Sequence, residues 1–129
     1  MMLNNSINID IIRQDKYNLQ KRLDAYIPIV TPKSYTMLVA CPYIVEVGAY
    51  TVGTDENHIM KLRDTWYPTL FSKECVDKIL SNYFTGCNGR KVQPKVYTEM
   101  QWYKEKVDTL TYTIEMLGKL EKKLENKEE

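Results

Sequence analysis

A long stripe of apolar side chains near the C-terminus constrains this chain more than any other feature. Between residues 97 and 127, apolar residues recur at alternating spacings of three and four. They are Met100, Tyr103, Val107, Leu110, Ile114, Leu117 and Leu124. This spacing places them on one face of an α-helix. Thr98 and Gln101 have the Thr-x-x-Gln spacing of a capping box, so we predict a helix over residues 98–127.

The same stripe can be written as heptads, with β-branched residues at position a and leucine at position d. That pattern favours a parallel two-stranded coiled coil. The candidate self-association seam consists of Met100, Val107, Leu110, Ile114 and Leu117. Gly118 weakens the helix after it, and Glu121 interrupts the apolar face. Two interpretations stay open: the helix packs within its own chain, on the sheet or antiparallel to residues 7–27, or it joins a second copy as a homodimer.

A second amphipathic helix is predicted near the N-terminus, over residues 7–27. Its apolar face consists of Ile12, Leu19, Leu23 and Tyr26, and Ser6 or Asn8 could cap it. The alternation of isoleucines at positions 7, 9 and 11 would also fit a short strand, but we favour a helix throughout. Pro28 is expected to end the helix, and residues 28–34 to form an extended linker.

The middle of the chain, residues 35–97, is predicted to be an α+β core. Apolar and β-branched runs indicate strands at Tyr35–Cys41, Tyr43–Val47, Ala49–Val52, His58–Arg63 and Lys91–Tyr97. Ser72 is a predicted cap for a short covering helix, with Phe71 and Val76 as a hydrophobic staple. The predicted fold class is therefore α+β: a small, mainly antiparallel sheet with one covering helix, flanked by two amphipathic helices in a single domain of residues 1–129.

Composition narrows the class of protein. The 18 basic and 17 acidic residues nearly balance, which is unlike a strongly basic nucleic-acid-binding domain. Three widely spaced cysteines indicate a reducing compartment rather than a disulfide framework. Neither a signal peptide nor a membrane span is recognisable, so we expect no membrane association and a cytoplasmic location in a bacterial host cell.

Candidate sites for chemistry are few. His58 is the only histidine and has no close cysteine, so no metal site and no cofactor are predicted. Cys75 falls in the first turn of the predicted covering helix, where a thiol can be activated, but a packed side chain explains it better. We therefore predict no catalytic residues and no enzymatic activity. In the loop over residues 86–95, three cations offer an alternative contact for phosphate or nucleic acid: Arg90, Lys91 and Lys95.

Residues Leu70–Leu80 (Leu-Phe-Ser-Lys-Glu-Cys-Val-Asp-Lys-Ile-Leu) open the predicted covering helix between two strand regions. This arrangement, in a chain rich in residues with AT-rich codons, resembles small phage and prophage proteins of AT-rich bacterial hosts. The resemblance covers roughly Tyr43 to Tyr97. Several such proteins inhibit host defence, including anti-CRISPR proteins, and the resemblance brings no catalytic residues.

These observations favour a non-enzymatic phage or mobile-element protein that binds and inhibits a host protein complex. The chain has ten tyrosines and two tryptophans, which are residue types that serve interfaces as well as cores. The partner-binding anchors that we predict are Tyr97, Trp102 and Tyr103. A small nucleic-acid-binding or nucleotide-binding protein using the loop over residues 86–95 is the alternative.

Overall fold

The computed structural model describes residues 8–31, 41–56, 58–82, 84–85 and 88–128. The chain divides into two compact units. One, here called the helical unit, consists of residues 1–31 and 103–129. The other, the sheet unit, consists of residues 32–102. Each is described by itself below.

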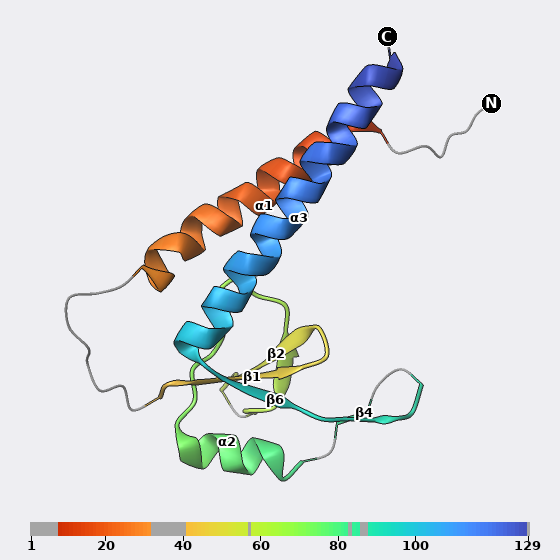
Figure 1. Ribbon diagram of the computed structural model, residues 1–129. Coiled ribbons are helices and arrows are strands. Elements are labelled where there is room, and N and C mark those ends of the chain that lie inside the picture. The colour runs from red at the N-terminus through yellow and green to blue at the C-terminus, as the bar shows by residue number, and fades with distance from the viewer. Residues whose placement is uncertain (1–7, 32–40, 57, 83, 86–87, 129) are drawn as a thin grey trace. The chain divides into compact units, whose positions relative to one another are not determined.

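The sheet unit is built on a four-stranded antiparallel sheet with the strand order β3-β2-β1-β6 (Figure 1). The strands are β1 (Tyr43–Val47), β2 (Tyr50–Gly53), β3 (Lys61–Arg63) and β6 (Lys95–Thr98). The α+β class predicted from the sequence is confirmed. Of the predicted strand Tyr35–Cys41, all but Cys41 lies outside the described residues.

A two-residue turn at Gly48 and Ala49 connects β1 to β2. Val47 pairs with Tyr50 across this turn, and Gly48 has a φ of 62°. A positive φ at the first central residue alone is the geometry of a type II′ hairpin turn, whose twist suits the flanking strands. Gly48 is therefore the first central residue of a tight hairpin turn.

One face of the sheet forms the core of the sheet unit together with helix α2 (Lys73–Leu80). The buried residues of this cluster are Val45, Val47, Val52, Phe71, Val76 and Ile79. Ser72 caps α2 by accepting a hydrogen bond from the Cys75 amide, as predicted. The helix ends at Leu80, whose side chain is exposed.

The predicted strand Lys91–Tyr97 is divided at Pro94. Residues Lys91–Val92 (β5) pair with Phe84–Thr85 (β4) in a separate two-stranded sheet, and β6 pairs with β1. Proline has no amide hydrogen for a ladder, so the strand breaks there. The sequence did not predict β4. As expected for a strand next to proline, β6 lies at an edge of the sheet.

Helix α3 (Glu99–Glu128) follows β6 directly and begins with the predicted capping box. The Gln101 amide donates to the Thr98 hydroxyl at 3.2 Å, and the Thr98 amide donates to the Gln101 side chain at 3.1 Å. The next residue, Trp102, is 2% exposed and its indole N–H donates to Glu46 of β1 at 2.9 Å. Glu46 therefore accepts a hydrogen bond from a buried tryptophan.

Helix α1 (Ile9–Val30) is longer than predicted at its C-terminal end. Asn8 caps it, which confirms one of the two predicted caps and excludes a strand from Ile9 onward. The expectation that Pro28 ends the helix was wrong, since the helix continues to Val30. Proline removes one backbone hydrogen bond and crowds the carbonyl four positions earlier, but Pro28 lies near the helix end, where Thr31 closes the last turn by donating to the Ile27 carbonyl.

In the helical unit, α1 and α3 run antiparallel. Near the start of α1, Arg13 and Lys16 contact Glu121 of α3. Near its end, the Tyr26 ring meets the Tyr103 ring edge-on, with 5.2 Å between the ring centroids. No helix among the described residues has both the length and the apolar composition that a membrane span requires.

Candidate functional site

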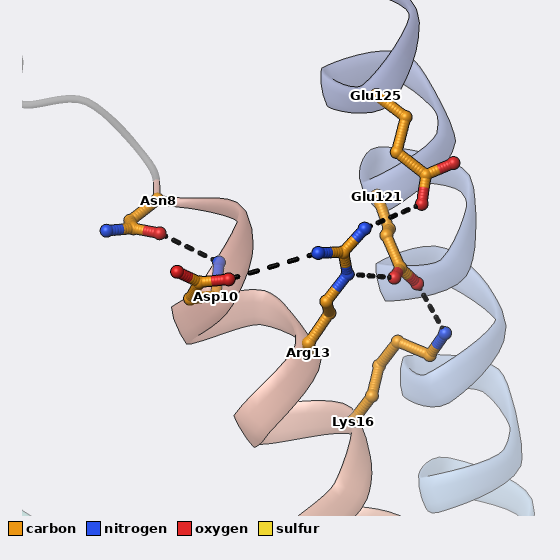
Figure 2. Close-up of polar contacts among 6 residues, drawn as sticks. All are labelled: Asn8, Asp10, Arg13, Lys16, Glu121 and Glu125. Carbon is orange, nitrogen blue, oxygen red and sulfur yellow. Dashed lines mark hydrogen bonds and ion pairs between the residues drawn. The ribbon is translucent and has the colours of Figure 1, made fainter. Parts of the chain in front are cut away.

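Polar side chains join the two helices of the helical unit at one end. The Arg13 guanidinium lies between Asp10 of its own helix and two carboxylates of α3 (Figure 2). Its Nε donates to Glu121 at 2.8 Å, and its Nη2 donates to Glu125 at 2.9 Å. Lys16 donates to the other Glu121 oxygen at 2.6 Å. This cluster fixes the register of two antiparallel helices.

The charges in the cluster shift the titration of its members. The hydrogen bonds from Lys16 and then from Arg13 lower the pKa of the Glu121 carboxyl. The hydrogen bond to Glu121 raises the pKa of Arg13. Because every carboxylate oxygen of Glu121 is engaged by a cation of the same unit, the cluster has a structural role rather than that of a general base.

Helix α1 contacts α3 at both ends of the apolar seam, through Tyr26 on Tyr103 and through Arg13 and Lys16 on Glu121. Leu110 and Tyr103 are buried, and Val107, Ile114 and Leu117 are partly buried. Met100, the first residue of the candidate seam, is 44% exposed. Of the two interpretations left open by the sequence, the described residues show the antiparallel packing against the N-terminal helix. Glu121 does not interrupt the seam but receives the cations of α1.

Two of the three predicted partner-binding anchors are not at the surface. Trp102 is 2% exposed and hydrogen-bonded to Glu46, and Tyr103 is 5% exposed and packed on Tyr26. A side chain buried within its own chain cannot present its area to another protein, so the surface role expected of these two residues is withdrawn. Tyr97 in β6 is partly buried.

The histidine and the cysteines, considered above for metal binding and thiol chemistry, also have structural surroundings. His58 is exposed, and its amide and carbonyl exchange hydrogen bonds with Asp55 in the turn between β2 and β3. Cys75 is partly buried against the core cluster, and Cys41 is exposed. Within the described ranges, no three side chains among histidine, cysteine, aspartate and glutamate come close enough together to hold a metal ion.

In the described part of the loop over residues 86–95, the cations are exposed and no anion site is built around them. Arg90, Lys91 and Lys95 are all exposed. The Arg90 amide already donates to the Asn88 side chain at 3.1 Å, so it does not point freely at a phosphate. A hollow of about 140 Å³ lies beside Lys91. That volume is small for a ligand pocket, since these usually exceed about 300 Å³.

Large apolar side chains are exposed at one edge of the sheet unit. They are Tyr50, Leu62, Trp66 and Tyr67, which are between 40% and 58% exposed. We call them the β3-edge surface. Leu62 pairs with Val52, and Tyr50 lies two residues before Val52 in the same strand, so Tyr50 and Leu62 point to the same face of the sheet as diagonal neighbours.

Trp66 and Tyr67 follow β3 in the chain and are also exposed. Because β2 and β3 are antiparallel, the end of β3 lies beside the start of β2, where Tyr50 is located. The chain leaves β3 there into a turn. In this turn, the Thr65 hydroxyl accepts a hydrogen bond from the Tyr67 amide and also contacts the Tyr67 carbonyl, each at 3.2 Å. These contacts hold the backbone of Tyr67 in a turn that leaves the Trp66 and Tyr67 side chains exposed.

Our sequence prediction of the anchors missed this surface. The available signal was the pair Trp66-Tyr67, followed by Pro68, in a segment with no regular periodicity. Aromatic residues in an irregular connection are more often available for binding than aromatic residues within a helical stripe. Comparisons of the chain with protein-family models, with curated proteins and with solved structures find no match.

Proposed function

We propose that this chain is a non-catalytic protein-binding module whose contact surface is the β3-edge surface. The single observation that supports this most strongly is the exposure of Trp66 and Tyr67 in the hydrogen-bonded turn that follows β3. Tryptophan and tyrosine are the residue types that contribute most at protein interfaces. Rigid aromatic side chains also lose little conformational entropy when they are bound.

The concrete form of this proposal is inhibition of a host protein complex by a phage or mobile-element protein, with a host defence complex as the target. This part rests on the sequence resemblance described above. It is consistent with a surface that binds rather than catalyses. We propose the cytoplasm of the bacterial host as the place where it acts.

The test compares capture of host proteins by the wild-type chain and by a Trp66→Ala/Tyr67→Ala variant. Loss of two hot-spot side chains should weaken binding at least about 30-fold, because each contributes on the order of 2 kcal/mol. Tyr17→Ala is the matched control, since Tyr17 is 57% exposed and Tyr67 is 58% exposed, but Tyr17 lies in the helical unit. The control should retain full capture.

Inhibition itself is measured in cells. Expression of the wild-type chain should restore plating of a phage that the host defence system otherwise restricts, and the double variant should not. Equal capture and equal plating by the double variant would overturn the proposal. So would the finding that the chain binds only nucleic acid, with a steep salt dependence that disappears on substitution of Arg90, Lys91 and Lys95.

A further inference from the structure

Helix α3 carries a second exposed face, distinct from the seam that α1 covers. Tyr112 is 64% exposed and Met116 is 42% exposed. With 3.6 residues per turn, these two residues and Leu120 form a stripe turned well away from Leu110, Glu121 and the other residues that face α1. The face lies wholly within the helical unit, so it is independent of the β3-edge surface.

The stripe combines a protrusion with a hollow. A hollow of about 420 Å³ is lined by Thr113, Met116, Leu117, Lys119, Leu120 and Lys123. Tyr112 is the protruding side chain. The apolar residues that line the hollow lie one helix turn or more C-terminal to it. The volume is within the range of pockets that receive a ligand or a side chain.

The charges on this face are divided along the helix. Asp108 lies on the N-terminal side of the apolar stripe, and Lys119 and Lys123 lie on the C-terminal side. Asp108, Lys119 and Lys123 also lie on the same flank of the stripe when the helix is drawn at 3.6 residues per turn. A parallel pair of such helices would place lysine beside lysine, whereas an antiparallel pair places aspartate beside lysine.

We propose that this face of α3 binds the same face of a second copy in an antiparallel pair centred on Met116. Tyr112 of each copy then lies level with Leu120 of the other and can enter its hollow. Measured along the helix axis, Lys123 of one copy is about 1.5 Å from the level of Asp108 of the other copy. Each contact occurs twice, as an isologous interface requires.

The expected association is weak. One pair of helices buries less surface than a standard stable interface, so we expect a Kd between about 10 and 500 μM. Sedimentation equilibrium of the full-length chain from about 1 μM to about 1 mM should therefore show a reversible monomer–dimer transition. A chain that stays monomeric throughout this range would overturn the proposal.

Met116→Glu tests the centre of the interface. It places two carboxylates opposite each other at the symmetry axis and should weaken the Kd at least about tenfold. Met116 is exposed and glutamate is a good helix former, so the monomer should keep its helical circular dichroism. Tyr17→Glu, on the exposed side of α1, is the control and should leave the Kd unchanged. If Met116→Glu dimerises like the wild type, this face of α3 is not the dimer interface.

Charge reversal tests the direction of the pair. Asp108→Lys and Lys123→Asp alone should each weaken the Kd by about fivefold, because each creates like-charge contacts. The double variant should return to within about twofold of the wild type. Within one chain these residues are about 22 Å apart along the helix, too far to pair, so the rescue can only come from the second copy. Additive weakening in the double variant would exclude the antiparallel pair.

Discussion

At the residue scale, Glu121 links the sequence of α3 to the packing of the helical unit. Within an apolar heptad pattern it is out of place. In the structure its side chain is 15% exposed and receives hydrogen bonds from both Arg13 and Lys16. An apolar residue at this position would remove the acceptor of Lys16 and one of the two acceptors of Arg13 on α3. The charge therefore selects one register of the two helices.

This pairing makes stability depend on pH in a defined direction. The pKa of Glu121 is lowered, first by the hydrogen bond from Lys16, below the ordinary glutamate value of 4.5. The unfolded chain thus binds more protons at acid pH than the folded chain does. The contribution of Glu121 is complete above pH 4.5 and is lost as pH falls through the lower folded-state pKa.

We therefore expect Glu121→Gln to lower the Tm at neutral pH and to lose most of this effect near about pH 3. Thermal unfolding followed by circular dichroism at both pH values measures the difference. Glu115→Gln, an exposed residue of the same helix, is the control and should change the Tm little at either pH. A Tm difference for Glu121→Gln that stays constant between neutral and acid pH would show that the carboxylate charge is not what stabilises the pair.

At the element scale, the start of α3 is defined by side chains rather than by the apolar stripe alone. Both reciprocal hydrogen bonds of the capping box are present, and Trp102 in the first turn is held by Glu46 of β1. The cap determines where the helix begins. The tryptophan determines which face of its first turn meets the sheet.

Thr98→Ala should therefore destabilise the chain by about 1 kcal/mol, the usual effect of removing an N-terminal cap. Urea unfolding followed by helical circular dichroism gives the change in free energy. Thr111→Ala is the matched control because Thr111 is exposed within the same helix, where alanine has the higher helix propensity. The role of the cap is refuted if both substitutions have the same effect.

Local signals in the sequence predicted the helix starts well, because a single capping side chain decides where each helix begins. The caps at Asn8, Ser72 and Thr98 each lie where their chemistry placed them. Long-range pairing could not be predicted in the same way. Glu46 and Trp102 are 56 positions apart in the sequence, and no local pattern predicts that they form a hydrogen bond.

The exposure of aromatic residues is likewise a property of the packing. Tyr103 and Tyr112 both lie on α3, yet one is 5% exposed and the other 64% exposed. The position of α1 decides which of them is covered. For this reason the predicted anchors Trp102 and Tyr103 were wrong, while the exposed aromatic residues at the β3 edge became visible only in the fold.

At the scale of the whole molecule, α3 belongs to both units. Its first residues, up to Trp102, are part of the sheet unit, and from Tyr103 onward it is part of the helical unit. A helix is a cooperative structure, so melting of one part removes the hydrogen-bonded support of the next turn. The prediction of a single domain, made from the sequence, can therefore be tested by unfolding.

The two units should unfold in one transition. Both tryptophans, Trp66 and Trp102, lie in the sheet unit, so intrinsic fluorescence reports on that unit. Circular dichroism at 222 nm reports mainly on α1 and α3. In a two-state protein the midpoints from the two probes coincide. Measuring at about 2 μM keeps the chain well below the concentration at which we expect it to self-associate.

A single variant then distinguishes units that are coupled through α3 from independent units whose unfolding midpoints happen to be equal. Trp102→Phe removes the indole N–H that Glu46 accepts and reduces the volume of a buried side chain, so it should destabilise the sheet unit by about 2–4 kcal/mol. Trp66 remains as the fluorescence probe. If α3 couples the units, the midpoints of fluorescence and of helical circular dichroism should fall together. If only the fluorescence midpoint falls, the helical unit is stable without the sheet unit, and the chain consists of two domains that share one helix.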